Sequence, residues 1–135
     1  MIPINFFGCT REQIVTCSLE EACDRFPCTG ITIPHVSALT SLGEALTGTA
    51  AFPADPVPSS HEPFSELSDY LQVAIRDASV EQLKDAGAQL AQMVPWEPLD
   101  ANPMDLAGFL IHLQSLVLGP DREGNRIFLV VEPAG

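Results

Sequence analysis

The feature that most constrains the fold is an uninterrupted apolar run near the C-terminus. Between Arg126 and Glu132 the chain reads Ile-Phe-Leu-Val-Val, and the whole segment has the length of one strand. A strand with one face in water alternates apolar and polar residues, whereas a strand covered on both faces is apolar throughout. The run therefore predicts a strand inside a sheet, with other parts of the chain packed on both of its faces.

The first third of the chain carries the other strands expected for this sheet. Ile2 to Phe7, Ile14 to Cys17 and Gly30 to Ile33 are rich in the β-branched and aromatic residues that favour strands. Between the second and the third, Ser18-Leu-Glu-Glu21 matches a capping box, in which side chains satisfy the free amides at the start of a helix. A short helix is therefore expected from Leu19 to about Phe26.

In the middle of the chain, apolar residues recur at helical spacing, apart from one proline-rich segment. A helix is expected from Val36 to near Gly48. The segment from Thr49 to Pro63 contains four prolines, which exclude a helix and a central strand, so a surface loop is expected there. Three further helices are predicted from Phe64 to Ala78, from Ser79 to Pro95 and from Asn102 to Gly119.

Strands near both ends of the chain, with helices between them, indicate a fold of the α+β class. We expect a small mixed sheet, built from the N-terminal strands and a C-terminal strand, packed against a helical middle of three to four helices. A chain of 135 residues, of which 46% are hydrophobic, has the size and composition of one domain with one core. Residues 1–135 are therefore predicted to form a single domain.

The charge of the chain restricts its partners. It has 18 Asp and Glu against 6 Lys and Arg, a formal net charge of −12. Between Glu44 and Phe109 eleven acidic residues are opposed only by Arg76 and Lys84, so most of the excess lies in the helical middle. Such a field attracts basic surfaces and repels anionic membranes and nucleic acid. A basic protein surface is the expected partner, with no direct nucleic-acid contact and no membrane.

Two sets of carboxylates in the helical middle are predicted to bind that partner. Glu62, Glu66 and Asp69 follow i, i+4, i+7 spacing around one predicted helix start, and Glu81 with Asp85 repeats the i, i+4 arrangement. Like charges at this spacing destabilise an isolated helix by about 0.2–0.5 kcal/mol per pair. The positive charges of a basic partner would turn this repulsion into attraction across the interface. The alternative is a solvated face, because the helix dipole stabilises carboxylates near helix N-termini.

The loop between the last two helices adds Trp96, Glu97 and Asp100 to the predicted binding residues. Trp96 is the only tryptophan, and prolines stiffen the acidic loop that carries it. Tryptophan is enriched among residues that anchor interfaces. The alternative, which is the more common arrangement for such a residue, is a side chain that folds back between helix ends and caps the core.

The four cysteines are Cys9, Cys17, Cys23 and Cys28. Their spacing lacks the C-x2-C pair with which a tight turn presents two thiolates to zinc, so reduced structural thiols are favoured over disulfides and over a zinc site that includes His35. The chain contains no phosphate-cradle, dinucleotide-binding or nucleophile-elbow motif. We therefore predict no metal, no cofactor and no catalytic residue.

Together these features predict a small acidic protein-binding inhibitor, of the immunity or antitoxin type, that occupies a basic cleft of a partner such as a toxin. The N-terminal residues lack the basic region and the apolar run of a signal peptide, so the cytoplasm is the expected location. One alternative is a small enzyme or ligand-binding domain whose pocket includes Cys17, His35 or His112. A second is a DNA mimic with acidic side chains in two rows.

Overall fold

The computed structural model describes residues 2–35, 37–48, 54–57, 64–118 and 124–131, and of Leu19 and Cys23 only the backbone. In chain order the elements are β1 (Ile2–Cys9), α1 (Arg11–Val15), α2 (Leu19–Arg25), β2 (Cys28–Ile33), α3 (Ser37–Thr47), β3 (Ala54–Pro56), β4 (Phe64–Leu67), α4 (Asp69–Asp77), α5 (Val80–Gln92), the 3-10 helix η1 (Val94–Leu99), α6 (Pro103–Ser115) and β5 (Arg126–Val131).

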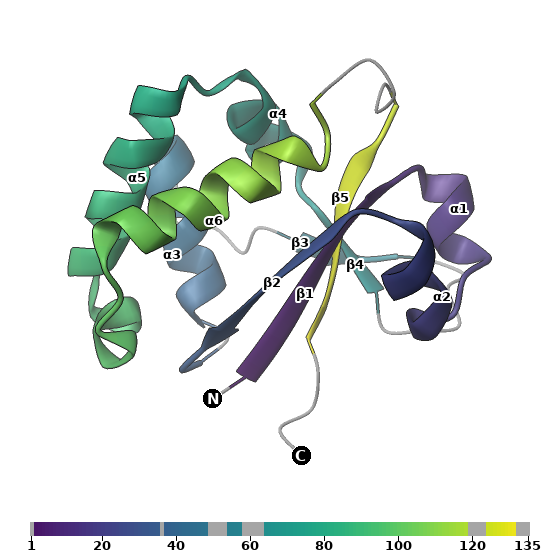
Figure 1. The fold of residues 1–135 in the computed structure, drawn as a ribbon, viewed down its shortest axis with the longest axis horizontal. Helices are drawn as coiled ribbons and strands as arrows, with labels where there is room; N and C mark the ends of the chain where they lie inside the picture. The colour runs from purple at the N-terminus through teal and green to yellow at the C-terminus, as the bar shows by residue number, and fades with distance from the viewer. Residues whose placement is uncertain (1, 36, 49–53, 58–63, 119–123, 132–135) are drawn as a thin grey trace.

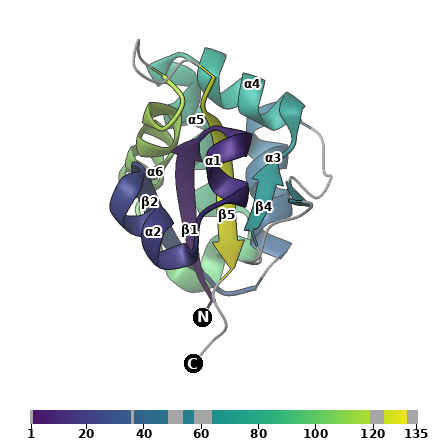
Figure 2. The same cartoon turned by 90° about the vertical axis from the view of Figure 1, so that its right-hand side faces the viewer.

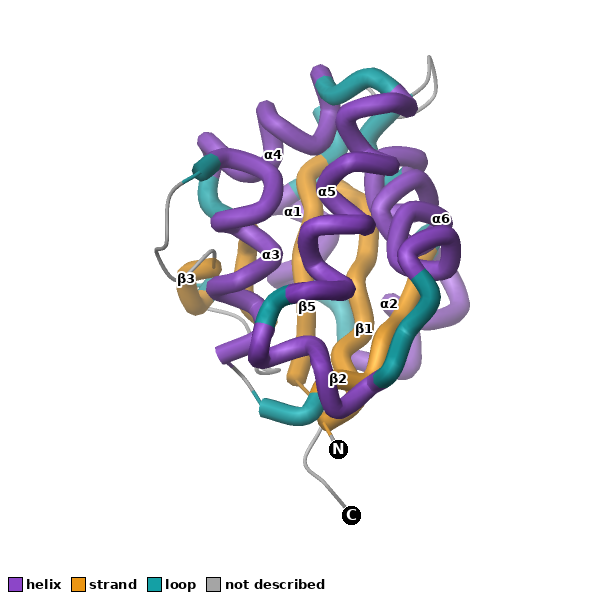
Figure 3. Tube along the Cα trace, turned by 90° about the vertical axis from the view of Figure 1, so that its left-hand side faces the viewer, coloured by secondary structure: helices purple, strands orange, loops and turns teal. Residues whose placement is uncertain are grey.

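These elements form three layers. The sheet stands in the middle, with α3 to α6 on one face and α1 and α2 on the other (Figure 1). Figure 2 looks onto the thin layer of α1 and α2, and Figure 3 looks onto the thick layer from the opposite side. This arrangement confirms the predicted α+β class. None of the helices within the described ranges is both long and apolar enough to cross a bilayer.

The strands are ordered β2-β1-β5-β4-β3 across the sheet. β5 lies between β1 and β4, and Ile127 to Val130 are buried, so the predicted strand with two covered faces is confirmed. We expected a mixed sheet from the sequence. Every strand pair among the described residues is antiparallel, so that part of the prediction is wrong. The pairing of β1 with β5 brings the two ends of the described chain together.

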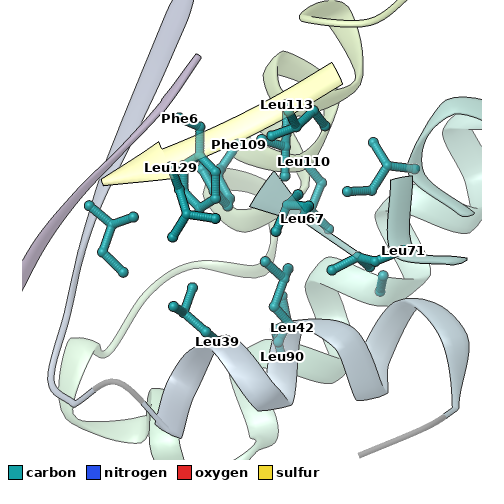
Figure 4. Packing of buried hydrophobic residues seen from close by; sticks show 14 of the residues in the cluster. Phe6, Leu39, Leu42, Leu67, Leu71, Leu90, Phe109, Leu110, Leu113 and Leu129 are labelled. Atoms are coloured by element: carbon teal, nitrogen blue, oxygen red, sulfur yellow. The ribbon is translucent and has the colours of Figure 1, made fainter. Parts of the chain in front are cut away.

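Side-chain alternation along β1 divides the interior into two cores. Ile4 and Phe6 point into the larger core, which α3 to α6 complete and of which Figure 4 shows a part. Phe7 and Cys9 point into the smaller core beneath α1 and α2. Because successive strand residues face opposite ways, one strand serves both cores.

The predicted strand from Ile14 to Cys17 is wrong, because Arg11–Val15 forms helix α1. Thr10 and Gln13 make a reciprocal capping box: the Gln13 amide donates to the Thr10 side chain, and the Thr10 amide donates to Gln13 Oε1 over 2.9 Å. These bonds satisfy two amides that a helix start leaves free. The local cap therefore outweighs the strand preference of Ile14 and its neighbours, and Ile14 packs in the smaller core.

The helix predicted from Phe64 begins later, because Phe64–Leu67 forms strand β4 and α4 starts at Asp69. A spacing of three residues suits one face of a helix, but in a strand it sends the two side chains to opposite faces. Phe64 packs edge-to-face against Phe7, with ring centroids 6.0 Å apart, in the smaller core, whereas Leu67 lies in the larger core.

The other predicted helices are confirmed, with changes at their ends. Ser79 and Gln82 form the capping box of α5, and Asn102 Oδ1 accepts from the Met104 amide over 2.8 Å at the start of α6. Helix α5 ends at Gln92, before Pro95, and η1 follows it. In the proline-rich segment, residues 54–56 form the short edge strand β3, and its other residues, apart from Val57, lie outside the described ranges.

Candidate functional site

The acidic residues of α5 lie beside a groove between α3, α4 and α5. The groove has a volume of about 440 Å³, and Figure 3 shows the three helices that enclose it. Four alanines line it, and their short side chains leave a hollow between the helix backbones: Ala45, Ala74, Ala78 and Ala86. The hollow thus follows from small residues placed where the three helices meet.

The groove combines an apolar floor with a polar rim. Leu46 and Val73 lie in it, and Val73 is 45% exposed although it sits among apolar neighbours. Asp77 of α4 and Asp85 of α5 contribute carboxylates to its edge. Glu81 is exposed one turn before Asp85 on the same helix. An apolar surface bordered by carboxylates matches a ligand that carries both apolar groups and positive charge.

The carboxylates of this rim differ in their partners. The Arg76 Nε donates to Asp77 Oδ1 over 3.4 Å. Within the part of the chain that the structure describes, neither Glu81 nor Asp85 has an ion-pair partner. Two negative charges thus stand together on an exposed helix face, at the predicted i, i+4 spacing, without an ion pair to another described residue.

Glu66 and Asp69 belong to a different cluster on the side of the sheet that α1 covers. Arg11 binds Glu66 through two bonds, Nε to Oε1 at 2.7 Å and Nη2 to Oε2 at 2.8 Å. Arg126 Nη2 lies 3.1 Å from Glu66 Oε2 and also bonds to Asp69. This cluster of Arg11, Glu66, Asp69 and Arg126 joins α1, β4, α4 and β5, and we call it the arginine–carboxylate cluster.

Two opposed effects set the pKa of Glu66. Its side chain is only 16% exposed, and this desolvation raises the pKa of the carboxyl. The hydrogen bonds and charges of Arg11 and Arg126 outweigh the desolvation, so the net pKa of Glu66 is below its ordinary value. Glu66 is thus an ionised carboxylate with its own counterions inside the fold.

The predicted helical patch of Glu62, Glu66 and Asp69 is therefore wrong in its geometry. Glu66 lies on strand β4, and its charge is already matched by two arginines that are distant in sequence. Asp69 is at the start of α4 and 79% exposed, so its role in binding stays a prediction. Glu62 lies outside the described residues.

Trp96 is not available to a partner. Its side chain is 1% exposed in the larger core, and its indole N–H donates to the Ala38 carbonyl over 3.0 Å. The binding role assigned to Trp96 is thus wrong, and the alternative, that it caps the core, is confirmed. Glu97 on η1 and Asp100 directly after it are exposed, and their role in binding stays a prediction.

The thiols and imidazoles of the enzyme alternative have separate environments. Cys17 lies in the smaller core, and its sulfur accepts from Arg25 Nη1 over 3.7 Å. The His35 ring bonds to Ser37 before α3, and His112 is exposed on α6. None of these three residues lines the groove between α3, α4 and α5. The described residues also include no group of three His, Cys, Asp or Glu that could hold a metal ion.

The buried thiol of Cys9 is far from a reactive form. Burial, and to a lesser extent the nearby Cys17, raises the pKa of Cys9 to about 12. Cys9 and Cys17 are both free and buried, whereas Cys28 is free and exposed on β2. At neutral pH Cys9 therefore acts as a small apolar side chain of the smaller core.

Comparison with models of known protein families, with curated proteins and with solved structures finds no match for this chain. The class that the fold defines is an α+β domain with an acid-rimmed groove on its helical layer. Sequence reasoning predicted Glu81 and Asp85 as binding residues from their spacing, and this role stays a prediction. Sequence reasoning missed Leu46, Val73 and Asp77, because only the packing of three helices brings these residues to the same groove.

Proposed function

We propose that this chain is a protein-binding inhibitor that docks its helical layer on a basic surface of a partner. The supporting observation is the exposed pair Glu81 and Asp85, which has no ion-pair partner among the described residues and lies beside a groove with an apolar floor. In this proposal, Lys or Arg side chains of the partner form ion pairs with the carboxylates at the rim of the groove. An apolar side chain of the partner fills the hollow.

The apolar floor supports a binding role over a merely solvated face. Among the residues that line the groove, Val73 of α4 is a large apolar side chain that is 45% exposed. Carboxylates alone would be well hydrated and need no hollow between the helices, whereas apolar groups that stay in water keep an unfavourable hydration cost. A partner that covers both kinds of group removes the apolar surface from water and matches the charge.

The proposed mechanism is inhibition by occupancy, without a chemical step. A chain with a net charge of −12 attracts a basic cleft over a distance and speeds the encounter. Once docked, α5 and its neighbours would fill the space where an anionic substrate of the partner binds. This is the manner of action of the immunity and antitoxin type, for which the partner is a toxin acting on nucleic acid or nucleotides.

The test is a charge reversal with a matched control on the other layer. Glu81→Lys with Asp85→Lys reverses the α5 pair, and Glu20→Lys with Asp24→Lys reverses an exposed i, i+4 pair on α2. Both double variants change the net charge equally. Affinity and association rate would be measured against a basic partner, sought first among the products of neighbouring genes, at several salt concentrations.

We expect the α5 variant to weaken the complex by about tenfold or more, mainly through the association rate at low salt. The α2 variant should retain most of the affinity. Equal losses in both variants would show only general attraction to an acidic protein. A partner that binds but keeps its full activity under saturating amounts of this chain would contradict the inhibitor role.

A further inference from the structure

The two edges of the sheet are protected differently. β3 forms one edge with only three residues, and Pro56 lacks the amide that would face outward at its end, because the neighbouring Val57 amide donates to the Phe64 carbonyl of β4. β2 forms the other edge with the six residues of Cys28–Ile33, which include no charge and no proline. Natural sheets usually shorten, charge or cover such an edge, because its free backbone groups are a template for another strand.

The register of β1 and β2 shows which backbone groups of β2 face outward. The Gly8 amide donates to the Pro27 carbonyl over 3.0 Å, so these opposite residues form a hydrogen-bonded pair. Hydrogen-bonded and non-hydrogen-bonded pairs alternate in an antiparallel ladder. Phe7 with Cys28, Asn5 with Gly30 and Pro3 with Thr32 are therefore the non-bonded pairs. The N–H and C=O groups of Cys28, Gly30 and Thr32 point to the free edge.

A second groove lies beside that edge. It has a volume of about 530 Å³ and runs between β2 and the segment that links η1 to α6. Gly30 to Thr32 line it on one side, and Leu99 and Phe109 add apolar surface. Asp100 and Asp105 supply two exposed carboxylates. Outward backbone groups, apolar side chains and negative charge therefore meet in one place.

We propose that β2 receives an extended segment of a partner protein as a sixth strand, and that basic residues of this segment lie opposite Asp100 and Asp105. The backbone bonds would supply affinity, and the side chains would supply specificity. The proposal does not depend on the groove of α5, because different residues carry it.

The charge argues for a foreign segment over a second copy of this chain. If two copies paired through β2, the segment entering each groove would be Cys28–Ile33, which contains no Lys or Arg. Asp100 and Asp105 would then remain without a counterion, in an assembly of two chains that each carry a net charge of −12. A strand with alternating apolar and basic residues satisfies the carboxylates and the edge together.

The probe is a synthetic seven-residue peptide in which Lys and Val alternate, and its control is the same peptide with every second amide N-methylated. Titration would be followed by calorimetry and by hydrogen exchange of the β2 amides. We expect exchange at Gly30 and Thr32 to slow by about tenfold or more at saturation, with little change at Ile31, which already bonds to β1. The N-methylated peptide should not bind.

Variants of the protein separate the backbone contribution from the charge. Thr32→Pro removes one outward amide and spares the ladder to β1, whereas Thr32→Val keeps that amide. We expect Thr32→Pro to weaken the peptide by about tenfold and Thr32→Val to leave it unchanged. Asp100→Asn with Asp105→Asn should reduce both the affinity for the peptide and the salt dependence of that affinity. Both positions are exposed, so this variant should fold and tests the proposal even if Thr32→Pro does not fold.

Three outcomes would overturn the proposal. Equal binding of the N-methylated peptide would mean that charge alone attracts it. Loss of peptide binding in Glu81→Lys with Asp85→Lys, with Thr32→Pro unaffected, would place the peptide in the groove of α5 instead. Dimerisation of the chain that Thr32→Pro abolishes, measured by sedimentation, would identify the occupant of the edge as a second copy.

Discussion

At the scale of single residues, the carboxylate of Glu66 is held by ion pairs to two arginines. These arginines, Arg11 and Arg126, belong to a helix and a strand far away in sequence. The pair with Arg126 is shielded better than the pair with Arg11, whose side chain is 63% exposed. Removing one partner of a shielded ion pair is destabilising, because the other charge is left buried without compensation. A solvated ion pair contributes little to the free energy of unfolding.

We predict that Glu66→Gln lowers the free energy of unfolding at neutral pH by about 1–2 kcal/mol. The arginines lower the pKa of Glu66 in the folded state below the ordinary glutamate pKa of 4.5. As the pH falls, the Glu66 carboxyl of the unfolded chain therefore binds its proton before that of the folded chain. The stabilisation is complete above the ordinary pKa and is lost as the pH falls through the folded pKa.

Urea unfolding between pH 7 and pH 3 would measure this effect. The variant should lose less stability than the parent on acidification, because the titrating carboxyl is gone. Glu97→Gln serves as the control, since Glu97 is exposed on η1. A parallel fall of stability with pH in the parent and in Glu66→Gln would contradict the prediction.

The free cysteines should differ strongly in reactivity. The thiolate is the nucleophile, and burial raises the pKa of Cys9 to about 12 while Cys28 is exposed. We predict rapid alkylation of Cys28 by iodoacetamide in the native protein and slow alkylation of Cys9 and Cys17. Peptide mapping by mass spectrometry would assign each site. In denaturant all should react alike, and native labelling of Cys9 at the rate of Cys28 would argue against its buried position.

At the scale of elements, the contact between α5 and α6 depends on one glycine. A Cβ atom at Gly87 would lie 2.7 Å from the Ala107 backbone nitrogen and 3.0 Å from its Cα. Backbone atoms cannot move aside as a flexible side chain can, so any larger residue must push the helices apart. Gly108 on α6 has open space where its Cβ would be.

The two glycines should therefore respond oppositely to the same substitution. We predict that Gly108→Ala stabilises the protein by about 0.5–1 kcal/mol, because alanine has the higher helix propensity. Gly87→Ala should destabilise it by about 1–3 kcal/mol in spite of that propensity, because overpacking outweighs it. Thermal and urea unfolding of both variants measure the difference. Stabilisation in both would mean that α5 and α6 approach less closely than described.

The elements that could be predicted from sequence are those with local signals. Ser79 and Asn102 marked the starts of α5 and α6, and the apolar run marked β5. Phe64 could not be assigned in this way, because its neighbours in space come from β1 and β5. The same holds for the site: spacing along α5 indicates Glu81, but no local pattern indicates that Arg11 binds Glu66.

At the scale of the whole molecule, the layers divide the acidic residues by role. The arginine–carboxylate cluster connects the thin helical layer to the sheet and to α4, and its acidic members already have counterions. The acidic residues beside the two grooves, among them Asp85 and Asp100, are exposed and remain open to partners. The net charge of −12 thus includes carboxylates that the fold neutralises and exposed carboxylates to which we assign a role in binding.

The central place of β5 also sets an order of events during synthesis. The backbones of β1 and β4 are linked in the sheet only by pairing with β5, which follows all the other described elements in the chain. A nascent chain that has emerged from the ribosome as far as α6 therefore has the β1–β2 and β3–β4 pairs but lacks the strand that joins them into one sheet. Both cores would remain open at that stage, so stable folding should appear abruptly, within the few residues of Arg126–Val131.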